Sequence, residues 1–330
     1  MFEKVNPGHP DKMADRLAGA VVDLVYERAG GLTKANPRVA CEVMAGHGRV
    51  DVQIETSLGR MDLRAEDIDP LIRRLFGERV EGNVLIAPQD AHLSDNQTRG
   101  LRCGDNGIFR GCPPTEEQRV LTAIAATMWE RFKSDGKYII DATDVERIEH
   151  EGIITHEKWA TYKMGSLNNL TICQSNATAE EIEEVIEAWD EQNDHILSSQ
   201  GRLWRWPYMI HNPLGPWTGG IDVDCGCTNR KLGSDMGDGV TGGGLMGKDL
   251  SKADVSVNIV CYLKAVASGQ VVTAMCSIGD ESVTFVYHDG HRETETFADI
   301  VEMARLYILT DCGGSFERFA EWGLLRPKAE

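Results

Sequence analysis

The chain has 330 residues, of which 42% are hydrophobic and 26% charged, so we expect a soluble globular protein of two or three domains. Its formal net charge of −18 argues against nucleic acid as the main partner, because phosphate backbones require a basic surface. The N-terminus lacks an apolar signal core, and no run reaches the roughly 18 apolar residues of a membrane helix. We therefore expect a cytoplasmic protein with no membrane partner.

The nine cysteines are an odd number and show no framework spacing. Several lie in apolar runs, which is typical of reduced, buried thiols in a cytosolic protein. The close pair Cys225-Gly-Cys227 has no second pair elsewhere in the chain, so structural thiols are favoured there over a zinc site.

The first hundred residues begin with PGHPDK at residues 7–12, which predicts a rigid turn leading into a helix near Ala14–Arg28. His9 and Asp11, fixed between prolines at a helix start, suit either a helix cap or contacts with phosphate and metal. The pattern then predicts strands Arg38–Met44 and Arg49–Thr56, helix Ala65–Phe76 and strand Asn83–Ala87. Acids inside such strands, here Glu42 and Glu55, usually lie on a solvated face.

The middle of the chain opens with a stretch, 88–113, that resembles a loop and includes a tight turn at 104–107 presenting Asp105. Two capping boxes, Thr115 with Gln118 and Thr178 with Glu181, predict helix starts. The predicted elements are helix Thr115–Lys133, strand Tyr138–Ala142, strand Leu170–Gln174 and a helix ending near Asn193. Residues 143–168 look like an insertion.

The last third begins with an aromatic stretch containing Trp204, Trp206, Tyr208 and Trp217, residues that more often serve a core or an interface than a ligand. The elements predicted after it are helix Ser251–Ala267, strands Val271–Ile278 and Ser282–Tyr287, helix Thr296–Leu309 and a short tail. The chain shows no internal sequence repeat. Alternating strands and helices favour an α+β fold with sheets packed against helices.

The stretch from Asp224 to Asp254 combines glycines 242–244 with four cations, Arg230, Lys231, Lys248 and Lys252. Glycines let backbone N–H groups approach an anion and the cations balance its charge, so this loop predicts triphosphate binding. Residues 242–248 spell G-x-x-x-x-G-K, but Asp249 follows where a P-loop needs Ser or Thr for Mg²⁺. No clear buried strand precedes the motif, so a P-loop phosphoryl transferase is disfavoured.

A set of motifs in collinear order resembles the S-adenosylmethionine synthetase (methionine adenosyltransferase) family. They are GHPDK (8–12), RVACE (38–42), GDNG (104–107), DGK (135–137), NP (212–213), GG-x-x-x-DCG (219–226), RK (230–231), GGG (242–244) and GKD-x-SK-x-D (247–254). The resemblance implies three similar α/β domains around a pseudo-threefold axis, which we place at 1–100, 101–206 and 207–330. It also implies a homodimer or dimer of dimers with active sites at the subunit interface.

The family reaction joins ATP and L-methionine: the thioether sulfur attacks C5′ and expels triphosphate, which is then hydrolysed to phosphate and diphosphate. Such chemistry needs positioned cations and metal for the leaving group, and no general base. The resemblance therefore implies Mg²⁺ and K⁺ as cofactors. A non-catalytic homologue acting as a regulatory or binding subunit remains the alternative from a different class.

Site residues carry over from the resemblance by motif. Those implied to contact the leaving triphosphate are His9, Lys137, Arg230, Lys231 and Lys248. Those implied to bind the rest of the substrates are Glu55, Gln89, Asp105, Asp135, Trp217, Asp224, Lys252 and Ile278. Those implied to hold metal are Asp11 and Asp254 for Mg²⁺ and Glu42 for K⁺.

Four features depart from the family pattern. The chain is shorter than typical members, and the segment between Gln89 and Asp105, a mobile gate in the family, is shortened. The glycine loop is one residue short, and the insertion at 143–168 has no counterpart. Because lids exclude water and complete active sites, we expect reduced closure, with an effect on turnover or substrate discrimination.

Overall fold

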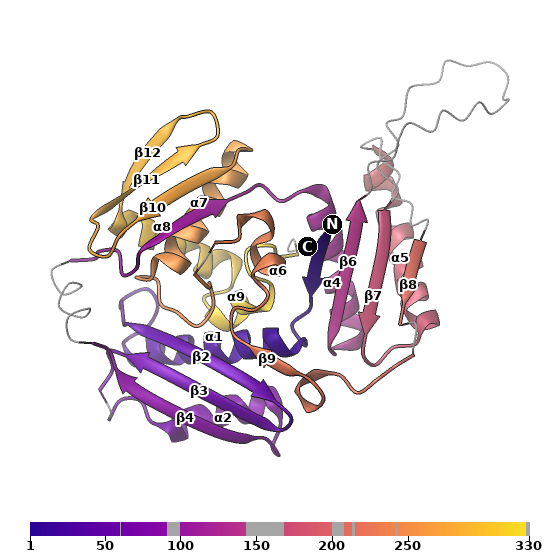
Figure 1. The fold of residues 1–330 in the computed structure, drawn as a ribbon, viewed down its shortest axis with the longest axis horizontal. Helices are drawn as coiled ribbons and strands as arrows, with labels where there is room; N and C mark the ends of the chain where they lie inside the picture. Colours follow the sequence, from indigo (N-terminus) through magenta and orange to yellow (C-terminus); the bar gives the residue numbers. More distant parts are fainter. Residues whose placement is uncertain are drawn as a thin grey trace.

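The computed structural model describes residues 1–59, 61–90, 100–142, 168–199, 208–212, 215–241 and 243–327 (Figure 1). Its strands are β1 (Phe2–Val5), β2 (Val39–Gly46), β3 (Arg49–Thr56), β4 (Glu81–Pro88), β5 (Gly107–Gly111), β6 (Gly136–Ala142), β7 (Asn168–Gln174), β8 (Tyr208–His211), β9 (Cys225–Cys227), β10 (Val272–Cys276), β11 (Ser282–Tyr287) and β12 (Arg292–Thr296). Its α-helices are α1 (Pro10–Arg28), α2 (Ala65–Phe76), α4 (Glu116–Phe132), α5 (Ala179–Ser199), α6 (Leu232–Met236), α7 (Ala253–Ser268), α8 (Phe297–Asp311) and α9 (Phe316–Trp322).

The strands of the described residues form three four-stranded sheets, in the orders β4-β3-β2-β9, β1-β6-β7-β8 and β12-β11-β10-β5. Each sheet is built around an antiparallel hairpin, β2/β3, β6/β7 or β10/β11. In the first two sheets the next strand returns parallel, after a helix, while β12 of the third pairs antiparallel with β11. The α+β class with three similar sheet-and-helix units is confirmed.

The three sheets exchange edge strands in a cycle. β1 precedes the hairpin β2/β3 in the chain but pairs with β6, β5 precedes β6/β7 but pairs with β10, and β9 precedes β10/β11 but pairs with β2. Each unit therefore donates its first strand to the next sheet, which explains the approximate threefold arrangement without any sequence repeat. The proposed domain boundaries remain a prediction.

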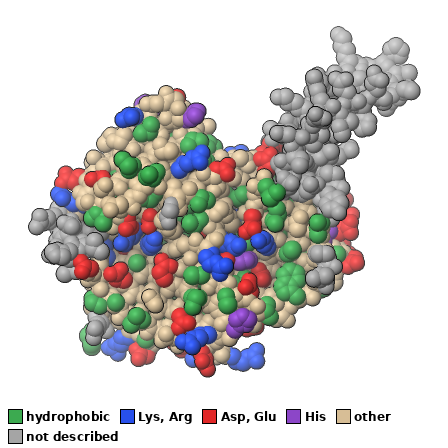
Figure 2. All heavy atoms as spheres, in the orientation of Figure 1, with side chains coloured by type: hydrophobic (Ala, Val, Ile, Leu, Met, Phe, Trp, Pro, Cys, Tyr) green, Lys and Arg blue, Asp and Glu red, His purple; other side chains and the backbone are tan. Residues whose placement is uncertain are grey.

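Charged side chains are distributed unevenly over the face of the molecule seen in Figure 2. Figure 2 shows Lys, Arg, Asp and Glu side chains in a band that runs between the region of β2–β4 and that of β10–β12. No helix among the described residues has the length and apolarity needed to cross a bilayer.

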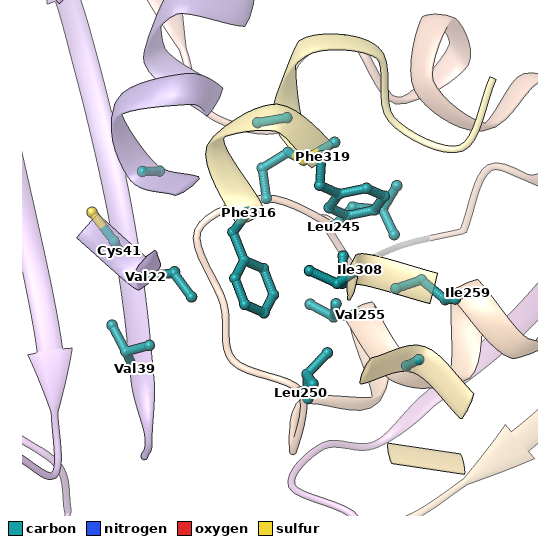
Figure 3. Close-up of a cluster of buried hydrophobic side chains, with 14 of the residues drawn as sticks. Val22, Val39, Cys41, Leu245, Leu250, Val255, Ile259, Ile308, Phe316 and Phe319 are labelled. Atoms are coloured by element: carbon teal, nitrogen blue, oxygen red, sulfur yellow. The ribbon is translucent and has the colours of Figure 1, made fainter. Parts of the chain in front are cut away.

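Two apolar cores hold the sheets together. The larger joins the sheet of β2 to the sheet of β10, through α1, α7, α8 and α9. Figure 3 shows Val22 and Val39 facing Phe316 of α9, with Leu245 and Leu250 of the glycine-rich segment among the same side chains. The smaller core lies between the β6/β7 sheet and helices α4 and α5. Since the glycine-rich segment is part of the larger core, its position is fixed by packing.

Local sequence signals account for most helix starts. The box of Thr115 with Gln118 caps α4, as predicted, and the second box, at Thr178, opens α5. The predicted start of the first helix is wrong by four residues: α1 begins at Pro10, because proline is well suited to the first turn, where no N–H partner is needed.

Several stretches predicted to be loops or a tail contain short strands and helices, so those predictions are wrong. Gly107–Gly111, within the stretch expected to be a loop, forms β5, and the expected tail contains α9, where Phe316 stacks on Tyr26 at 5.3 Å. The expected long loop at 224–254 contains β9 and α6. The altered gate at 91–99, most of the insertion at 143–168, and Trp204, Trp206 and Gly242 lie outside the described residues.

Candidate active site

The N-terminus of α1 fixes His9 and Asp11. His9 is the N-cap, and its Nδ1 accepts a hydrogen bond from the Asp11 backbone N–H at 3.2 Å. Burial, with the positive charge of Lys231 added, lowers the pKa of His9 to about 3. The imidazole is therefore neutral at physiological pH, and its proton is on Nε2, which remains available to donate a hydrogen bond.

Strand β9 and the turn that follows it bring the basic pair Arg230 and Lys231 to this helix end. The Cys227 N–H donates to Asp11 Oδ1 at 2.9 Å, and the Asn229 N–H donates to Asp15 Oδ1 at 2.8 Å. A Cβ at Gly226 would lie 2.0 Å from the Pro10 carbonyl oxygen, so only glycine allows this approach. Arg230 Nη1 then lies 3.5 Å from Asp11 Oδ1, and Lys231 Nζ lies 3.9 Å from Oδ2.

A second pair of contacts links Lys137 to Lys231 through Glu3, a residue that sequence reasoning missed. Glu3 Oε2 lies 2.7 Å from Lys137 Nζ, and Oε1 lies 3.2 Å from Lys231 Nζ. Glu3 is opposite Ile139 in the β1/β6 ladder, so Lys137 is its diagonal neighbour on the same face. Only this register, which joins residues far apart in sequence, brings the three together.

Asp135 and Trp217 are positioned where the segment 217–220 packs against the ends of β6 and β7. The Asp135 carboxylate accepts the Gly220 N–H at 3.3 Å, and Ser175 accepts the Trp217 N–H through its carbonyl at 2.7 Å. Burial is the main cause that raises the pKa of Asp135 to about 6, and nearby Asp224 adds to it. Trp217 leaves 43% of its surface exposed, as a stacking platform requires.

We define the first half-site as the set that these contacts and charge interactions join. Its members are His9, Asp11, Asp135, Lys137, Trp217, Asp224, Arg230 and Lys231.

The segment before α7 forms a second group. Lys248 Nζ lies 2.8 Å from Asp254 Oδ2, and Lys252 Nζ lies 3.9 Å from Asp105 Oδ1. A Cβ at Gly243 would lie 1.7 Å from Asp254 Oδ1, so the glycine loop wraps directly over this carboxylate. Burial raises the pKa of Asp105, which Lys252 opposes.

The remaining predicted residues lie on the sheet surface next to that group. Glu55 is exposed on β3 and pairs with Ala40, which itself forms a bridge with Lys248. Glu42 is exposed on β2 and accepts a hydrogen bond from the Thr228 hydroxyl. The Gln89 N–H donates to the Thr56 carbonyl at 3.0 Å, and the Ile278 N–H donates to Asn106 Oδ1 at 2.8 Å.

We define the second half-site as this set of residues around α7 and the outer sheet surface. Its members are Glu55, Gln89, Asp105, Lys248, Lys252, Asp254 and Ile278. Glu42 lies between the two sets, because Thr228, which donates to it, follows Cys227, whose N–H donates to Asp11 of the first half-site.

The two half-sites remain separate within one chain. Where the structure describes the chain, no ion pair joins a member of one to a member of the other. The groups that shift the pKa of His9 and Asp135 belong to the first set, together with Glu3 and the backbone of Gly220, whereas those that shift the pKa of Asp105 are Lys248, Lys252, Asp254 and the adjacent Asp249. Both sets contain cations and acids suited to an anionic ligand and a cation that accompanies it.

The carboxylates suit a metal that is bound largely by its ligand. Each half-site has a carboxylate in contact with its cations, Asp11 in the first, and Asp254 together with Asp105 in the second. No group of three or more His, Cys, Asp or Glu side chains with metal-site geometry occurs among the described residues, and none therefore adds a third ligand to Cys225 and Cys227. Mg²⁺ is commonly held by one or two carboxylates together with phosphate oxygens, so this donor set fits a metal–nucleotide complex.

Comparison with known proteins was made at the level of sequence and of fold. No family model matches the sequence. The chain is 26% identical to the S-adenosylmethionine synthase of Jannaschia sp. (strain CCS1), over 92% of this chain and 83% of that protein. It is equally similar, at 26%, to the S-adenosylmethionine synthase of Cereibacter sphaeroides, over 94% of this chain and 84% of the other.

The fold is similar to that of a solved structure described as an unusual S-adenosylmethionine synthetase from Campylobacter jejuni. The TM-score is 0.62 at 18% identity, and the match covers 98% of this chain and 93% of the other. This likeness extends over all three sheets.

Proposed function

We propose that this chain, a divergent member of the S-adenosylmethionine synthase family, makes S-adenosylmethionine from ATP, L-methionine and water and releases phosphate and diphosphate. The observation that carries this proposal is the first half-site. There a neutral histidine with a free N–H donor lies beside Lys231, within a basic cluster that includes Lys137 and Arg230. That arrangement suits a leaving triphosphate.

In the proposed chemistry, the methionine sulfur attacks C5′ of ATP and the bond from C5′ to the triphosphate oxygen breaks. Negative charge develops on that oxygen, and His9 Nε2–H would donate to it. Lys137, Arg230, Lys231 and Lys248 would stabilise the charge on the three phosphoryl groups. A thioether carries no proton, so the step needs no general base, and the main remaining contribution is alignment of sulfur with C5′.

The substrates would be held by residues of both half-sites. Trp217 would stack on adenine, with Ile278 against its other side, while Asp135 and Asp224 would contact ribose. Glu55 and Asp105 would hold the methionine ammonium group, Lys252 its carboxylate, and Gln89 would approach methionine from the end of β4. Bound Mg²⁺ would neutralise phosphate charge beside Asp11 and Asp254. Glu42 would contribute an oxygen ligand to K⁺.

We further propose that the working unit is a homo-oligomer in which the first half-site of one subunit faces the second half-site of another. The separation of the half-sites within one chain supports this, and so does the exposed apolar surface beside the second. Met44 of β2 is 59% exposed and Leu85 of β4 is 58% exposed. On the third sheet Ile108 and Met275 are paired neighbours, 69% and 72% exposed. A second copy would cover them, in a dimer or a dimer of dimers.

The direct test is incubation of the protein with ATP, methionine, Mg²⁺ and K⁺, followed by measurement of S-adenosylmethionine, phosphate and diphosphate. All three products together are expected. ATP binding without any product would instead indicate a non-catalytic regulatory homologue. Formation of ADP without methionine would indicate phosphoryl transfer of the P-loop type.

A further inference from the structure

Asn6, the residue that follows β1, is fully buried between two turns that carry members of the first half-site. The first turn, 7–9, precedes α1 and places His9. The second turn, 134–136, leads into β6 and places Asp135. The family motifs do not include Asn6 and the proposed reaction gives it no role, so its contacts with the two turns need an explanation.

The side-chain amide of Asn6 binds both turns at once. Its Oδ1 accepts the N–H of Gly8 at 3.0 Å and the N–H of Gly136 at 3.2 Å. Its Nδ2 donates to the Ser134 carbonyl at 2.7 Å and to the Tyr138 hydroxyl at 3.0 Å. Two N–H donors face Oδ1 and a carbonyl faces Nδ2, so the amide has one favoured orientation and uses all of its hydrogen-bonding groups.

Two glycines bring the turns into direct contact around this amide. A Cβ at Gly8 would lie 3.0 Å from the Asp135 nitrogen, and a Cβ at Gly136 would lie 2.7 Å from Asn6 Nδ2. The backbone adds two hydrogen bonds, from the Asn6 N–H to the Gly136 carbonyl and from the His9 N–H to the Asn6 carbonyl, both at 3.1 Å. Because no space is left for a side chain between the turns, Asn6 fixes the place of His9 relative to Asp135.

We propose that Asn6 is a positioning residue for the proposed reaction, which holds the turn of His9 against the turn of Asp135 so that both face the same substrate. The role rests on the proposed function, because His9 would donate to the leaving oxygen while Asp135 would contact the ribose of the same ATP molecule. That oxygen and the ribose are joined through C5′, the carbon under attack. A shift of about 1 Å between the turns would misalign the donor, and such a shift costs about 10²-fold in rate.

Asn6→Ser removes the bridge between the turns and keeps the local turn. A serine hydroxyl can accept the N–H two residues further on, that of Gly8, but it is shorter than the amide and loses the second turn. We expect folded Asn6→Ser to have a kcat about 10²-fold below that of the wild type. KM for methionine should not change, because the proposed methionine contacts belong to the second half-site.

Tyr138→Phe is the matched control. It removes a buried hydroxyl of the same network, which accepts from Asn6 Nδ2 and donates to Gln174 Oε1 at 2.6 Å. It leaves in place both N–H groups that donate to Asn6 Oδ1, and therefore the bridge. Tyr138→Phe should lower the midpoint of thermal unfolding but keep the wild-type kcat, measured well below the unfolding temperature of each variant. Circular dichroism checks that both variants are folded.

The outcomes separate the role of Asn6 from the proposed reaction. Wild-type kcat in folded Asn6→Ser would overturn the positioning role, and so would an equal loss of kcat in Tyr138→Phe, since general loosening of the region would explain both.

If the wild type binds ATP but makes no S-adenosylmethionine, the proposed reaction fails, and ATP affinity measured by calorimetry takes the place of kcat. Binding about tenfold weaker in Asn6→Ser alone, as for loss of about one hydrogen bond, would then support the positioning role, and unchanged binding would overturn it. A wild type that binds no ATP would overturn both proposals.

Discussion

The two ring nitrogens of His9 have different partners, and this allows its structural and chemical contributions to be separated. Nδ1 caps α1 by accepting the Asp11 N–H, while Nε2–H is free to donate. Asparagine at an N-cap can accept the same backbone N–H but does not extend to the position of Nε2. The cap and the proposed donor can therefore be removed independently.

We predict that His9→Asn keeps the thermal stability of the wild type but lowers kcat by about 10²-fold, as expected for loss of one donor to developing charge. His9→Ala should lower kcat similarly and also destabilise the fold by about 1 kcal/mol through loss of the cap. Thermal unfolding and steady-state kinetics measure the two effects. Equal kcat in His9→Asn and the wild type would show that Nε2 has no role in the reaction.

Asp135 gives a pH dependence with a defined sign. Its pKa is raised to about 6, chiefly by burial, so the carboxylate is ionised above pH 6 and protonated below it. Protonation removes charge from the acceptor that holds the Gly220 N–H and is proposed to contact ribose. We predict that kcat/KM for ATP falls as the pH drops through about 6.

The matched variant for this prediction is Asp135→Asn, which should have a lower kcat/KM that changes little between pH 5.5 and 7.5, a range chosen about that pKa. If kcat/KM of Asp135→Asn still falls at low pH as in the wild type, the fall is caused by a group other than Asp135. The low pKa of His9 excludes that residue as its source, since the imidazole stays neutral throughout this range.

At the scale of elements, the sequence was informative where a signal is local. Helix α4 follows from a capping box and an apolar stripe, and α2 and β3 begin and end at the predicted residues. The exchanged edge strands β1, β5 and β9 were missed because they are only 4, 5 and 3 residues long, too short to show a period. Each of these strands forms only by pairing with a strand far away in the sequence, and the contact of Glu3 with Lys137 depends on one such pairing, β1 with β6.

The site residues show the same limit. The sequence identified cations and acids by their motifs, yet it could not tell that Asp11 and Lys231 meet while Lys248 belongs elsewhere. That division follows from β9 pairing with β2 and docking its glycine on the start of α1. Glu3 belonged to no quoted motif, so register alone reveals it.

The C-terminal element is secured by Lys4, which is fully buried. Its Nζ donates to the carbonyl oxygens of Ser234, Leu325 and Trp322 at 2.7, 2.8 and 3.0 Å. The end of α9 is thereby attached to α6, the helix that follows Lys231. We predict that Lys4→Met destabilises the protein by about 3 kcal/mol at neutral pH, because buried carbonyls lose their donor. Urea unfolding measures this, and a loss below about 1 kcal/mol would contradict it.

The same lysine predicts how stability changes with pH. Burial lowers the pKa of Lys4 to about 7, below its unfolded value of about 10.4, so the unfolded chain binds more protons between these values. Wild-type stability should therefore rise relative to Lys4→Met as the pH increases from 7 to about 10. A difference that stays constant or shrinks over this range would show that Lys4 stays charged when buried.

At the scale of the whole molecule, the cyclic exchange of edge strands makes the three sheets one unit and leaves two half-sites on it. The first half-site alone has His9 but lacks Lys248, and so lacks a cation for part of the triphosphate. The second half-site alone has Lys248 but lacks His9, the proposed donor to the leaving oxygen. If the two halves meet only between subunits, a loss in one half should be complemented by a subunit defective in the other.

We therefore predict that His9→Asn and Lys248→Ala, each nearly inactive alone, recover activity when mixed, unfolded and refolded together. Random pairing of equal amounts makes half of the dimers mixed. Each mixed dimer has one site with both halves intact and one with both halves altered, so about a quarter of wild-type activity should return. Mixing His9→Asn with Lys137→Ala, which alters the same half-site, is the control and should recover nothing, because every site in that mixture keeps one defect. No recovery in the first mixture despite dimers in solution would show that each site is completed within one chain. Recovery in the control would show that His9 and Lys137 of one site come from different subunits.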